Sequence, residues 1–419
     1  LSIELSVSQD TAELSFLDLD RNNSEQVKLS SRVIDDVQSI VWQYMQNAKQ
    51  SSLYFVIGGK EDEHSEAPGQ RNSVWRNILK RLISGNTANA FLIFLLLSFA
   101  LFFIIGIYTV FVMIVFQLVY LFFSDRIAMN LGNVHPTAEQ PLVTIVSVRS
   151  DRETLKAIYT YARKMLPEIR EEIMKTVHVP TTPEERLGVK TTVLQILSRH
   201  GVKVSLNDIE IRTRNVYGIV QRVSTKFHRD PPSIVMQNSL VSNAAATGRS
   251  TKHSSIMITA GSLEDLNEEE LESVIGHELG HVKGHDPIIL FCVTSFEFFG
   301  RFFLWLPLFL SQPIIYFIVA FGAIFAVGKV LETRADTESA VVLGTPQFMA
   351  SALAKIGLRQ LYHEKYSPVA KIFDWFQFDP HPPIYFRVKR MSGFKPGTEV
   401  KHMFLVSLRD CIEGFLAAF

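Results

Sequence analysis

The stretch Asn267 to Asp286, NEEELESVIGHELGHVKGHD, holds the residues whose spacing implies the most specific chemistry in this chain. It opens on a capping-box pattern, Asn followed three residues later by Glu, and apolar residues then recur at helical spacing, so we expect a helix. His277 and His281 would lie one turn apart on one face of it, where two imidazoles can bind one zinc ion. Glu278, between them, is placed to act as a general base on a bound water. Because this HExxH pattern also occurs by chance, the surrounding sequence must support it.

The composition is balanced in charge and rich in apolar residues. The 419 residues include 42 basic and 42 acidic side chains, so the chain has no net charge and no overall electrostatic field. This balance argues against nucleic acid as a partner. The mean hydropathy of +0.15 and the 31 phenylalanines are typical of a protein with membrane spans. Cys292 and Cys411 match no disulfide or thiol-metal framework, which fits a reducing compartment.

Two long apolar runs predict membrane hairpins. Residues 88–123 form a run of 36 without a charge, which at a rise of about 1.5 Å per residue is long enough for two spans of a bilayer core about 30 Å thick. We expect a hairpin that turns near Gly106. The alternative is one long tilted helix, which would put the two flanking regions on opposite sides of the membrane. In residues 287–330, Pro307 and Pro313 bracket a second turn, so two more spans fit.

The charges around these runs predict the orientation. Basic residues lie at the outer ends of both hairpins while the turns are uncharged, which places the outer ends in the cytoplasm by the positive-inside rule. We therefore expect a multi-pass integral membrane protein, in the plasma membrane of a prokaryote, with the zinc motif on the cytoplasmic side. Glu297 and Arg301 lie one turn apart in the third span. They either form an ion pair that faces the bundle or line a wet cavity that leads to the zinc.

The predicted fold class is an α/β membrane protein with an N-terminal soluble α/β domain. The expected limits are 1–70 for the N-terminal domain, 71–87 for a linker, 88–123 and 287–330 for the hairpins, and 124–286 and 331–419 for the two parts of the protease domain. Periodicity predicts strands at 1–7, 53–57, 142–148, 209–211, 219–223 and 256–259, and helices at 33–48, 152–175 and 184–199.

A third zinc ligand is expected just after the fourth span. A catalytic zinc site has three protein ligands and leaves the fourth position to water. Glu332 and Asp336 lie one turn apart on an expected helix. We assign Glu332 as the third ligand and Asp336 as the acceptor of an imidazole N–H, that of His277. A solvated acidic surface helix is the alternative, but the position after a hairpin that follows HExxH favours the ligand.

A segment of small polar residues precedes the last expected strand. The sequence VSNAAATGRSTKHSS, residues 241–255, can present its backbone as an edge strand to an extended peptide. An ordinary surface loop is the alternative interpretation.

Taken in order, these motifs resemble the HtpX family of membrane-bound zinc metalloproteases, whose wider group includes the CAAX prenyl proteases. The resemblance spans roughly residues 88–395 and rests on two pairs of spans and four motifs: NAAATGR at 243–249, HELGHVKGHD at 277–286, ETRAD at 332–336 and DPHPPIYFR at 379–387. The N-terminal 85 or so residues lie outside the usual family core, which leaves regulation or adaptor contacts open.

The resemblance implies a gluzincin-type catalytic domain with one zinc ion per chain. It implies zinc bound by His277, His281 and Glu332, and Glu278 as the catalytic carboxylate. The family's substrate-holding edge strand corresponds to Asn243, Ala244, Ala245 and Ala246. Its His-Pro motif near the active site corresponds to His381 and Pro382, with Arg387 on the following helix; either His381 or Arg387 is a candidate donor to the oxyanion.

The favoured function is an endopeptidase that cuts misfolded or membrane proteins at the cytoplasmic face of the bilayer. A prenyl-protein processing protease would use the same site, although such proteases have a larger helical chamber than four spans provide. A membrane scaffold with a purely structural zinc is the third hypothesis. The intact HExxH argues against it, because a structural site needs no base.

Overall fold

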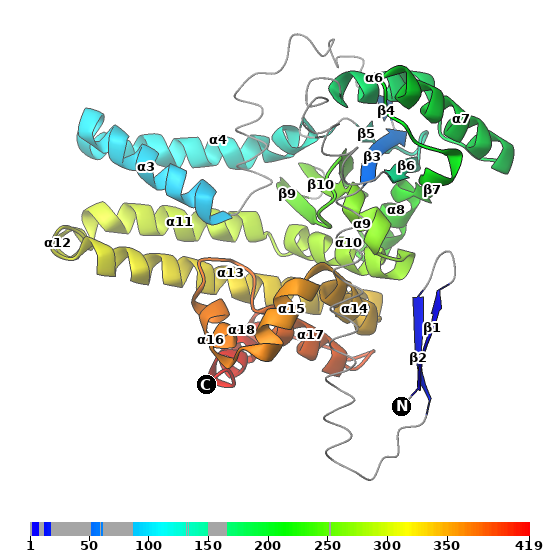
Figure 1. Cartoon of the computed structure of the whole chain (residues 1–419). Helices are drawn as coiled ribbons and strands as arrows, with labels where there is room; N and C mark the ends of the chain where they lie inside the picture. Colours follow the sequence, from blue (N-terminus) through cyan, green and yellow to red (C-terminus); the bar gives the residue numbers. More distant parts are fainter. Residues whose placement is uncertain are drawn as a thin grey trace. The chain divides into compact units, whose positions relative to one another are not determined.

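The structure of the chain is a computed structural model (Figure 1). It describes residues 2–7, 12–17, 52–58, 60–61, 87–130, 132, 134–149, 166–250 and 253–419. The chain divides into two compact units, Leu1–Ser51 and Ser52–Phe419. In the first, β1 (Ser2–Val7) pairs with β2 (Ala12–Leu17) as an antiparallel hairpin, so the strand predicted at 1–7 is confirmed. The helix predicted at 33–48 lies outside the described residues.

A three-stranded antiparallel sheet opens the second unit, in the order β3 (Ser52–Gly58), β6 (Leu142–Arg149) and β7 (Ile209–Asn215). Two helices, α6 (Leu166–Thr176) and α7 (Pro183–Arg199), pack on it over a buried apolar core. These elements confirm the strands predicted at 53–57, 142–148 and 209–211 and the helix at 184–199. β3 thus belongs to the second unit, while the domain limits drawn from the sequence stay a prediction.

Residues 219–223, predicted as a strand, are part of the helix α8 (Val216–Lys226), so that prediction is wrong. Its buried apolar residues lie at positions i, i+3, i+4 and i+7, which is the spacing of one helical face. Asn215 caps the helix by accepting a hydrogen bond from the N–H of Gly218 at 2.7 Å. Three apolar residues within a stretch of five, Ile219, Val220 and Val223, fit either a strand or a helix when taken alone, and the cap at Asn215 identifies the helix.

A five-stranded sheet follows, in the order β4 (Lys60–Glu61), β5 (Val134–His135), β8 (Ser233–Gln237), β10 (His253–Thr259) and β9 (Ala244–Ser250). β8 and β10 are parallel, and the other pairs are antiparallel. The strand predicted at 256–259 is confirmed in β10. The small-residue segment forms β9, which is an edge strand of this sheet.

Two helical hairpins project from the sheets (Figure 1). The first consists of α3 (Thr87–Ile105), the short turn η1 (Gly106–Tyr108) and α4 (Thr109–Met129). The chain reverses at Gly106, whose φ of 59° is in the left-handed region, and α4 returns alongside α3. The second consists of α11 (Asp286–Phe303), α12 (Leu306–Ser311) and α13 (Pro313–Leu343).

The surfaces of these hairpins are apolar. Among the described residues, two stretches are long and apolar enough to cross a membrane, Leu96–Met129 and Pro313–Leu343. Their large side chains face outward: Phe103 is 84%, Phe111 59% and Ile318 57% exposed. Water does not favour so continuous an apolar surface, whereas a bilayer does.

The charges inside the second hairpin are paired and buried. The Arg301 guanidinium donates to both carboxylate oxygens of Glu297 at 2.8 to 3.1 Å, and the Tyr316 hydroxyl donates to Glu297 at 3.0 Å. Arg301 also lies 5.1 Å from the ring centres of Phe298 and Phe317. Of the two interpretations offered by the sequence, this is the ion pair that faces the bundle.

The zinc-motif helix α10 (Glu268–Lys283) packs closely against α13 because glycines face the contact. A Cβ on Gly276 would lie 2.6 Å from the Ser339 Oγ, and one on Gly280 would lie 3.2 Å from the Ala335 Cα. Both distances are shorter than ordinary van der Waals contact. The small residues therefore let the two helix backbones approach closely enough for side chains of α10 and α13 to meet.

Replacing Gly280 with Val should separate these helices. The added methyl groups meet the backbone of Ala335, which cannot rotate away, so we expect a loss of about 1–3 kcal/mol in unfolding free energy. Thermal unfolding in detergent measures it. Gly188→Val is the matched control, because nothing lies within 4 Å of a Cβ at that exposed helical position. Unfolding of both variants at the wild-type temperature would show that the close packing is not needed.

Five helices complete the unit after α13. They are α14 (Pro346–Ile356), α15 (Leu358–Tyr366), α16 (Pro368–Phe376), α17 (Ile384–Gly393) and α18 (Met403–Leu416). In α18, Cys411 and Ser407 contact Thr333 and Thr337 of α13, so this helix covers α13 beside the zinc motif.

Candidate active site

The helix that carries the HExxH motif begins where the capping box predicts. The Asn267 side chain accepts a hydrogen bond from the Glu270 N–H at 2.8 Å, and the Glu270 carboxylate accepts one from the Asn267 N–H at 2.9 Å. His277 and His281 follow on the face of α10 that packs against α13.

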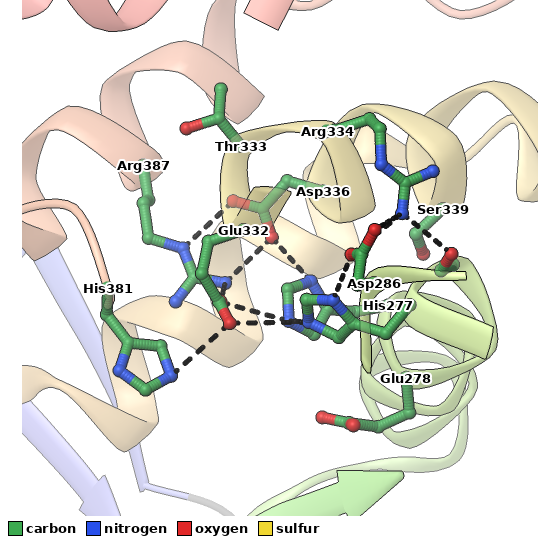
Figure 2. A network of polar contacts seen from close by, with 12 residues as sticks. His277, Glu278, Asp286, Glu332, Thr333, Arg334, Asp336, Ser339, His381 and Arg387 are labelled. Atoms are coloured by element: carbon green, nitrogen blue, oxygen red, sulfur yellow. Dashed lines mark hydrogen bonds and ion pairs between the residues drawn. The ribbon is translucent and has the colours of Figure 1, made fainter. Parts of the chain in front are cut away.

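Three predicted ligand side chains meet between α10 and α13 (Figure 2). The Nε2 atoms of His277 and His281 are 3.1 Å apart, and each lies 3.3 Å from a carboxylate oxygen of Glu332. Two ligands about 2.0–2.1 Å from a tetrahedral zinc are about 3.3 Å apart, so this spacing fits a zinc ion. The donor set, two imidazoles and one carboxylate, is that of a catalytic zinc site.

An aspartate holds the outer nitrogen of each imidazole. The His277 Nδ1 lies 2.8 Å from the Asp336 Oδ1, which is the contact expected from the sequence. The His281 Nδ1 lies 2.7 Å from the Asp286 Oδ2. Each contact fixes the tautomer that leaves Nε2 available for a metal. The sequence does not predict this contact of Asp286, because its approach to His281 depends on the turn between α10 and α11.

That turn is made by His285, whose φ of 56° and ψ of 34° are left-handed. This single residue changes the direction of the backbone between the two helices, so that Asp286 begins α11 and also contacts His281. His285 itself is exposed and takes no part in the ligand cluster.

Each aspartate is in turn held by an arginine. Arg387 donates to both oxygens of Asp336 at 2.8 and 2.9 Å. Arg334 donates to both oxygens of Asp286 at 2.9 Å and to the Gly280 carbonyl at 2.9 Å. Two Arg–Asp–His chains therefore support the two histidines from opposite sides (Figure 2). Arg334 was not among the residues singled out from the sequence, although it lies inside the ETRAD motif.

The surrounding carboxylates raise the pKa of both histidines. Burial lowers the pKa of His281, but the Glu332 carboxylate and the hydrogen bond to Asp286 outweigh it and raise the pKa to about 10. Burial is likewise outweighed at His277 by Asp336 and Glu332, and its pKa is raised. Because a metal binds only the neutral imidazole, metal binding at this cluster must release protons.

Glu278 faces the edge strand. Its side chain is nearly buried, at 8% exposure, and its carboxylate accepts a hydrogen bond of 2.6 Å from the N–H of Ala246 in β9. In Figure 2 it lies apart from the Arg–Asp pairs, on the strand side of the imidazoles. The structure thus brings the predicted base and the predicted substrate strand into contact.

His381 lies at the rim of the cluster. Its Nδ1 is 2.7 Å from the Asp379 Oδ1, and its Nε2 is 3.7 Å from the Glu332 Oε1, while the side chain is 54% exposed. The preceding loop is fixed to α13, because the Lys329 Nζ donates to the carbonyls of Gln377 and Asp379 at 3.0 and 2.5 Å.

Glu364 positions α17, the helix that carries Arg387, and was not expected from the sequence. Its carboxyl group accepts hydrogen bonds from the N–H groups of Ile384 and Tyr385 at 3.0 and 2.7 Å, which caps the helix. Burial and the neighbouring Asp374 raise the pKa of Glu364 to about 8. It precedes its helix by 20 residues, too far for any capping signal in the sequence.

Glu364 should make stability pH-dependent. An unfolded glutamate has a pKa of about 4.3, so with a folded pKa of about 8 unfolding releases a proton between these values. Stability is then lost as pH rises through that window. We expect the melting temperature of wild type to fall relative to Glu364→Gln between pH 5 and 8. Parallel curves for the two proteins would contradict this, and Glu413→Gln on the surface is the control.

The supporting aspartates should tune metal affinity. Loss of the acceptor on an imidazole N–H costs about 10- to 100-fold in metal affinity, so we expect this loss for Asp336→Asn and for Asp286→Asn. Competition with a fluorescent zinc chelator measures it. Asp374→Asn, in which the altered carboxylate contacts neither histidine, should bind as wild type does. Wild-type affinity in both site variants would exclude the supporting role.

The donor set is the one expected of a metalloprotease that carries an HExxH motif. Residues 210–395 match the model of peptidase family M48. Protease HtpX of Legionella pneumophila (strain Lens) is 31% identical over 201 residues, which cover 43% of this chain and 68% of that protein. The Protease HtpX homolog of Thermodesulfovibrio yellowstonii is 30% identical over 232 residues, covering 47% and 80%. The chain belongs to the HtpX-like proteases of peptidase family M48, which confirms the resemblance seen in the sequence.

Among solved structures, the crystal structure of S. mikatae Ste24p aligns with 57% of this chain and 64% of its own, at 16% identity and a TM-score of 0.33. A TM-score this low supports no conclusion about the fold of this chain.

Proposed function

We propose that this chain is a membrane-anchored zinc metalloendopeptidase that cleaves misfolded or membrane proteins at the cytoplasmic face of the bilayer. The observation that carries the proposal is the convergence of the His277, His281 and Glu332 ligand atoms at 3.1 to 3.3 Å, with Glu278 one residue from a ligand. A purely structural site would not need a carboxylate beside it.

The chain's own residues would share the chemistry as follows. A zinc ion held by His277, His281 and Glu332 would polarise a peptide carbonyl and make water more acidic. Glu278 takes the proton of the attacking water and returns it to the leaving amine. Asp336 and Asp286 hold the imidazoles in orientation, so the ligand geometry does not have to form during the reaction.

The substrate would pair with the free edge of β9. The Asn243 carbonyl accepts from the Thr259 N–H at 3.1 Å, so it faces β10. Backbone groups alternate in direction along a strand, so Ala244 and Ala246 face the open edge and Ala245 faces β10. The N–H of Ala246 that now meets Glu278 lies on that edge. Pairing through backbone groups tolerates many side chains, which suits a protease of misfolded chains.

Of the two predicted oxyanion donors, we propose His381. Its Nδ1 donates to Asp379, and the nearby Glu332 carboxylate together with Asp379 raises the pKa of His381, which favours the imidazolium form with a second donor N–H at Nε2 facing the cluster. Arg387 already uses two of its N–H groups on Asp336, and we assign it to holding that aspartate.

The two apolar hairpins support the proposed membrane position. α11 continues directly from the HExxH helix, and α13 carries Glu332, so both halves of the ligand set join apolar helices. We propose two hairpins with four spans, outer ends in the cytoplasm and the plasma membrane of a prokaryote as the location, together with the domain limits drawn from the sequence.

The test is metal content and proteolysis of the full chain in detergent. We expect about one zinc per chain and cleavage of casein, loss of cleavage after treatment with a chelator, and recovery on adding zinc. Bound zinc without cleavage of casein or of an unfolded membrane protein would favour the scaffold. Cleavage confined to prenylated peptides would favour the prenyl-processing alternative.

A further inference from the structure

The helix α16 exposes one apolar stripe. Val369, Phe373 and Phe376 lie at i, i+4 and i+7 and are 59%, 65% and 59% exposed. The charged residues of the helix lie on another side, where the Lys371 Nζ is 5.4 Å from the Tyr385 ring centre. This distribution is that of an amphipathic helix whose apolar side is largely exposed.

The helix α18 exposes a second apolar stripe. Its buried side packs on α13 through Ser407 and Cys411. The next side of the helix is apolar and exposed, and beyond it lie Arg409 and Glu413, whose side chains are 65% and 69% exposed. The exposed apolar residues are Phe404 (44%), Leu405 (60%), Leu408 (36%), Ile412 (51%) and Leu416 (63%).

The two stripes form one surface. The Phe376 ring centre is 5.5 Å from that of Phe415 and 6.5 Å from that of Phe419, at the C-terminal end of α18. We call this surface the C-terminal apolar face and define it as Val369, Phe373, Phe376, Leu405, Leu408, Ile412, Leu416 and Phe419. So many large apolar side chains on one exposed surface indicate contact with a membrane or another protein.

The position of α16 along α13 favours the membrane. Phe378, just after α16, lies 6.0 and 5.8 Å by ring centres from Phe321 and Phe325 of α13. Phe325 follows Pro313, the first residue of that helix, by 12 residues, which is about 18 Å along its axis. A hydrocarbon core is about 30 Å thick. Measured along α13 from the turn of the hairpin, the contact with Phe378 therefore lies within the thickness of the hydrocarbon core.

We propose that the C-terminal apolar face lies against the cytoplasmic leaflet of the bilayer, with α18 antiparallel to α13 along its contacts Ser407–Thr337 and Cys411–Thr333, so that its C-terminal end approaches the lipid. The inference rests on the membrane position in the proposed function. Lys371 and Arg409 flank the stripes, as basic residues do on helices that meet lipid headgroups. The Gln377–Asp379 loop joins α16 to His381, so the lipid surface would adjoin the rim of the metal cluster.

The experiment measures where this face lies without using activity. Nitroxide labels are placed at Phe373→Cys or Ile412→Cys in the full chain, with Cys292→Ser and Cys411→Ala, and the protein is reconstituted in vesicles of phosphatidylcholine and phosphatidylglycerol. Power saturation compares collision with oxygen, which enters lipid, and with a nickel chelate, which stays in water. Phe116→Cys on α4, 53% exposed, is the lipid control, and Leu187→Cys on α7, 59% exposed, is the water control.

We expect the labels at 373 and 412 to resemble the label at 116, with oxygen collisions several-fold above those of the water control. If the label at 116 is in lipid, two results would overturn this inference while leaving the proposed membrane position intact. The first is that the labels at 373 and 412 have the collision rates of the label at 187. The second is that their spectra broaden through contact with a second copy of the chain. If 116 is itself in water, the membrane position in the proposed function fails as well. Zinc content and casein cleavage are measured separately and report on the catalytic proposal.

Discussion

Replacing Glu278 with Gln should abolish casein cleavage while about one zinc per chain remains bound. Glutamine has nearly the same shape, and its carbonyl oxygen can still accept the 2.6 Å hydrogen bond from the Ala246 N–H. It cannot take a proton from water at neutral pH. A positioned general base contributes about 10²- to 10⁴-fold to the rate, so we expect kcat to fall by at least that factor with little change in zinc affinity.

The matched control is Glu269→Gln, which makes the same chemical change on an exposed side chain of the same helix. It should cut casein as wild type does. If Glu278→Gln retained wild-type cleavage, Glu278 would not be the base, and the scaffold hypothesis would become the better explanation of the zinc site. Metal content measured on the same sample separates loss of the base from loss of the metal.

Replacing Glu332 with Gln should remove the metal itself. Both imidazole Nε2 atoms lie 3.3 Å from this carboxylate, and it is the charged ligand of the set. A neutral amide leaves two imidazoles without a compensating anion, so we expect zinc affinity to fall by more than the 10- to 100-fold typical of outer-shell changes. Cleavage should fall in parallel and recover partly in excess zinc.

The control for this variant is Glu413→Gln, an exposed carboxylate of α18 whose side chain is 69% exposed. Zinc affinity is measured by competition with a chelator at fixed pH, because the raised pKa of His281 makes binding pH-dependent. Retention of wild-type affinity in Glu332→Gln would show that another group is the third ligand. Asp336 is then the first to test, since it already contacts His277.

The sequence predicts the HExxH helix well, because its cap and its two histidines are recognised from residues that are close together in the chain. The capping box and the i, i+4 histidines fix the start and the facing side of α10 from neighbouring residues alone. Glu332 was found by position, because a carboxylate one turn from Asp336 after a hairpin has few other uses. Both parts of the pattern are local in sequence, and the structure brings them together.

The contacts that the sequence did not reveal depend on a left-handed backbone turn and on residues far apart in the chain. Asp286 reaches His281 only because His285 adopts a left-handed conformation, and Glu364 caps a helix that begins 20 residues later. The strand predicted at 219–223 was wrong for a related reason: three apolar residues in a stretch of five do not specify a period, and the cap at Asn215 that identifies the helix lies outside that stretch.

The helix α13 runs without interruption for 31 residues, from the turn of the apolar hairpin to beyond Asp336. At about 1.5 Å per residue it is about 46 Å long. Its N-terminal half lies among hydrophobic side chains, and its C-terminal half carries Glu332, in a cluster whose ligand atoms are 3.1 to 3.3 Å apart. The other two ligands belong to the helix that continues into the partner arm of the same hairpin. A bilayer that is too thick or too thin changes helix tilt. In the membrane position proposed above, we infer that the thickness of the surrounding lipid would act on the spacing of the ligands through the tilt of these helices.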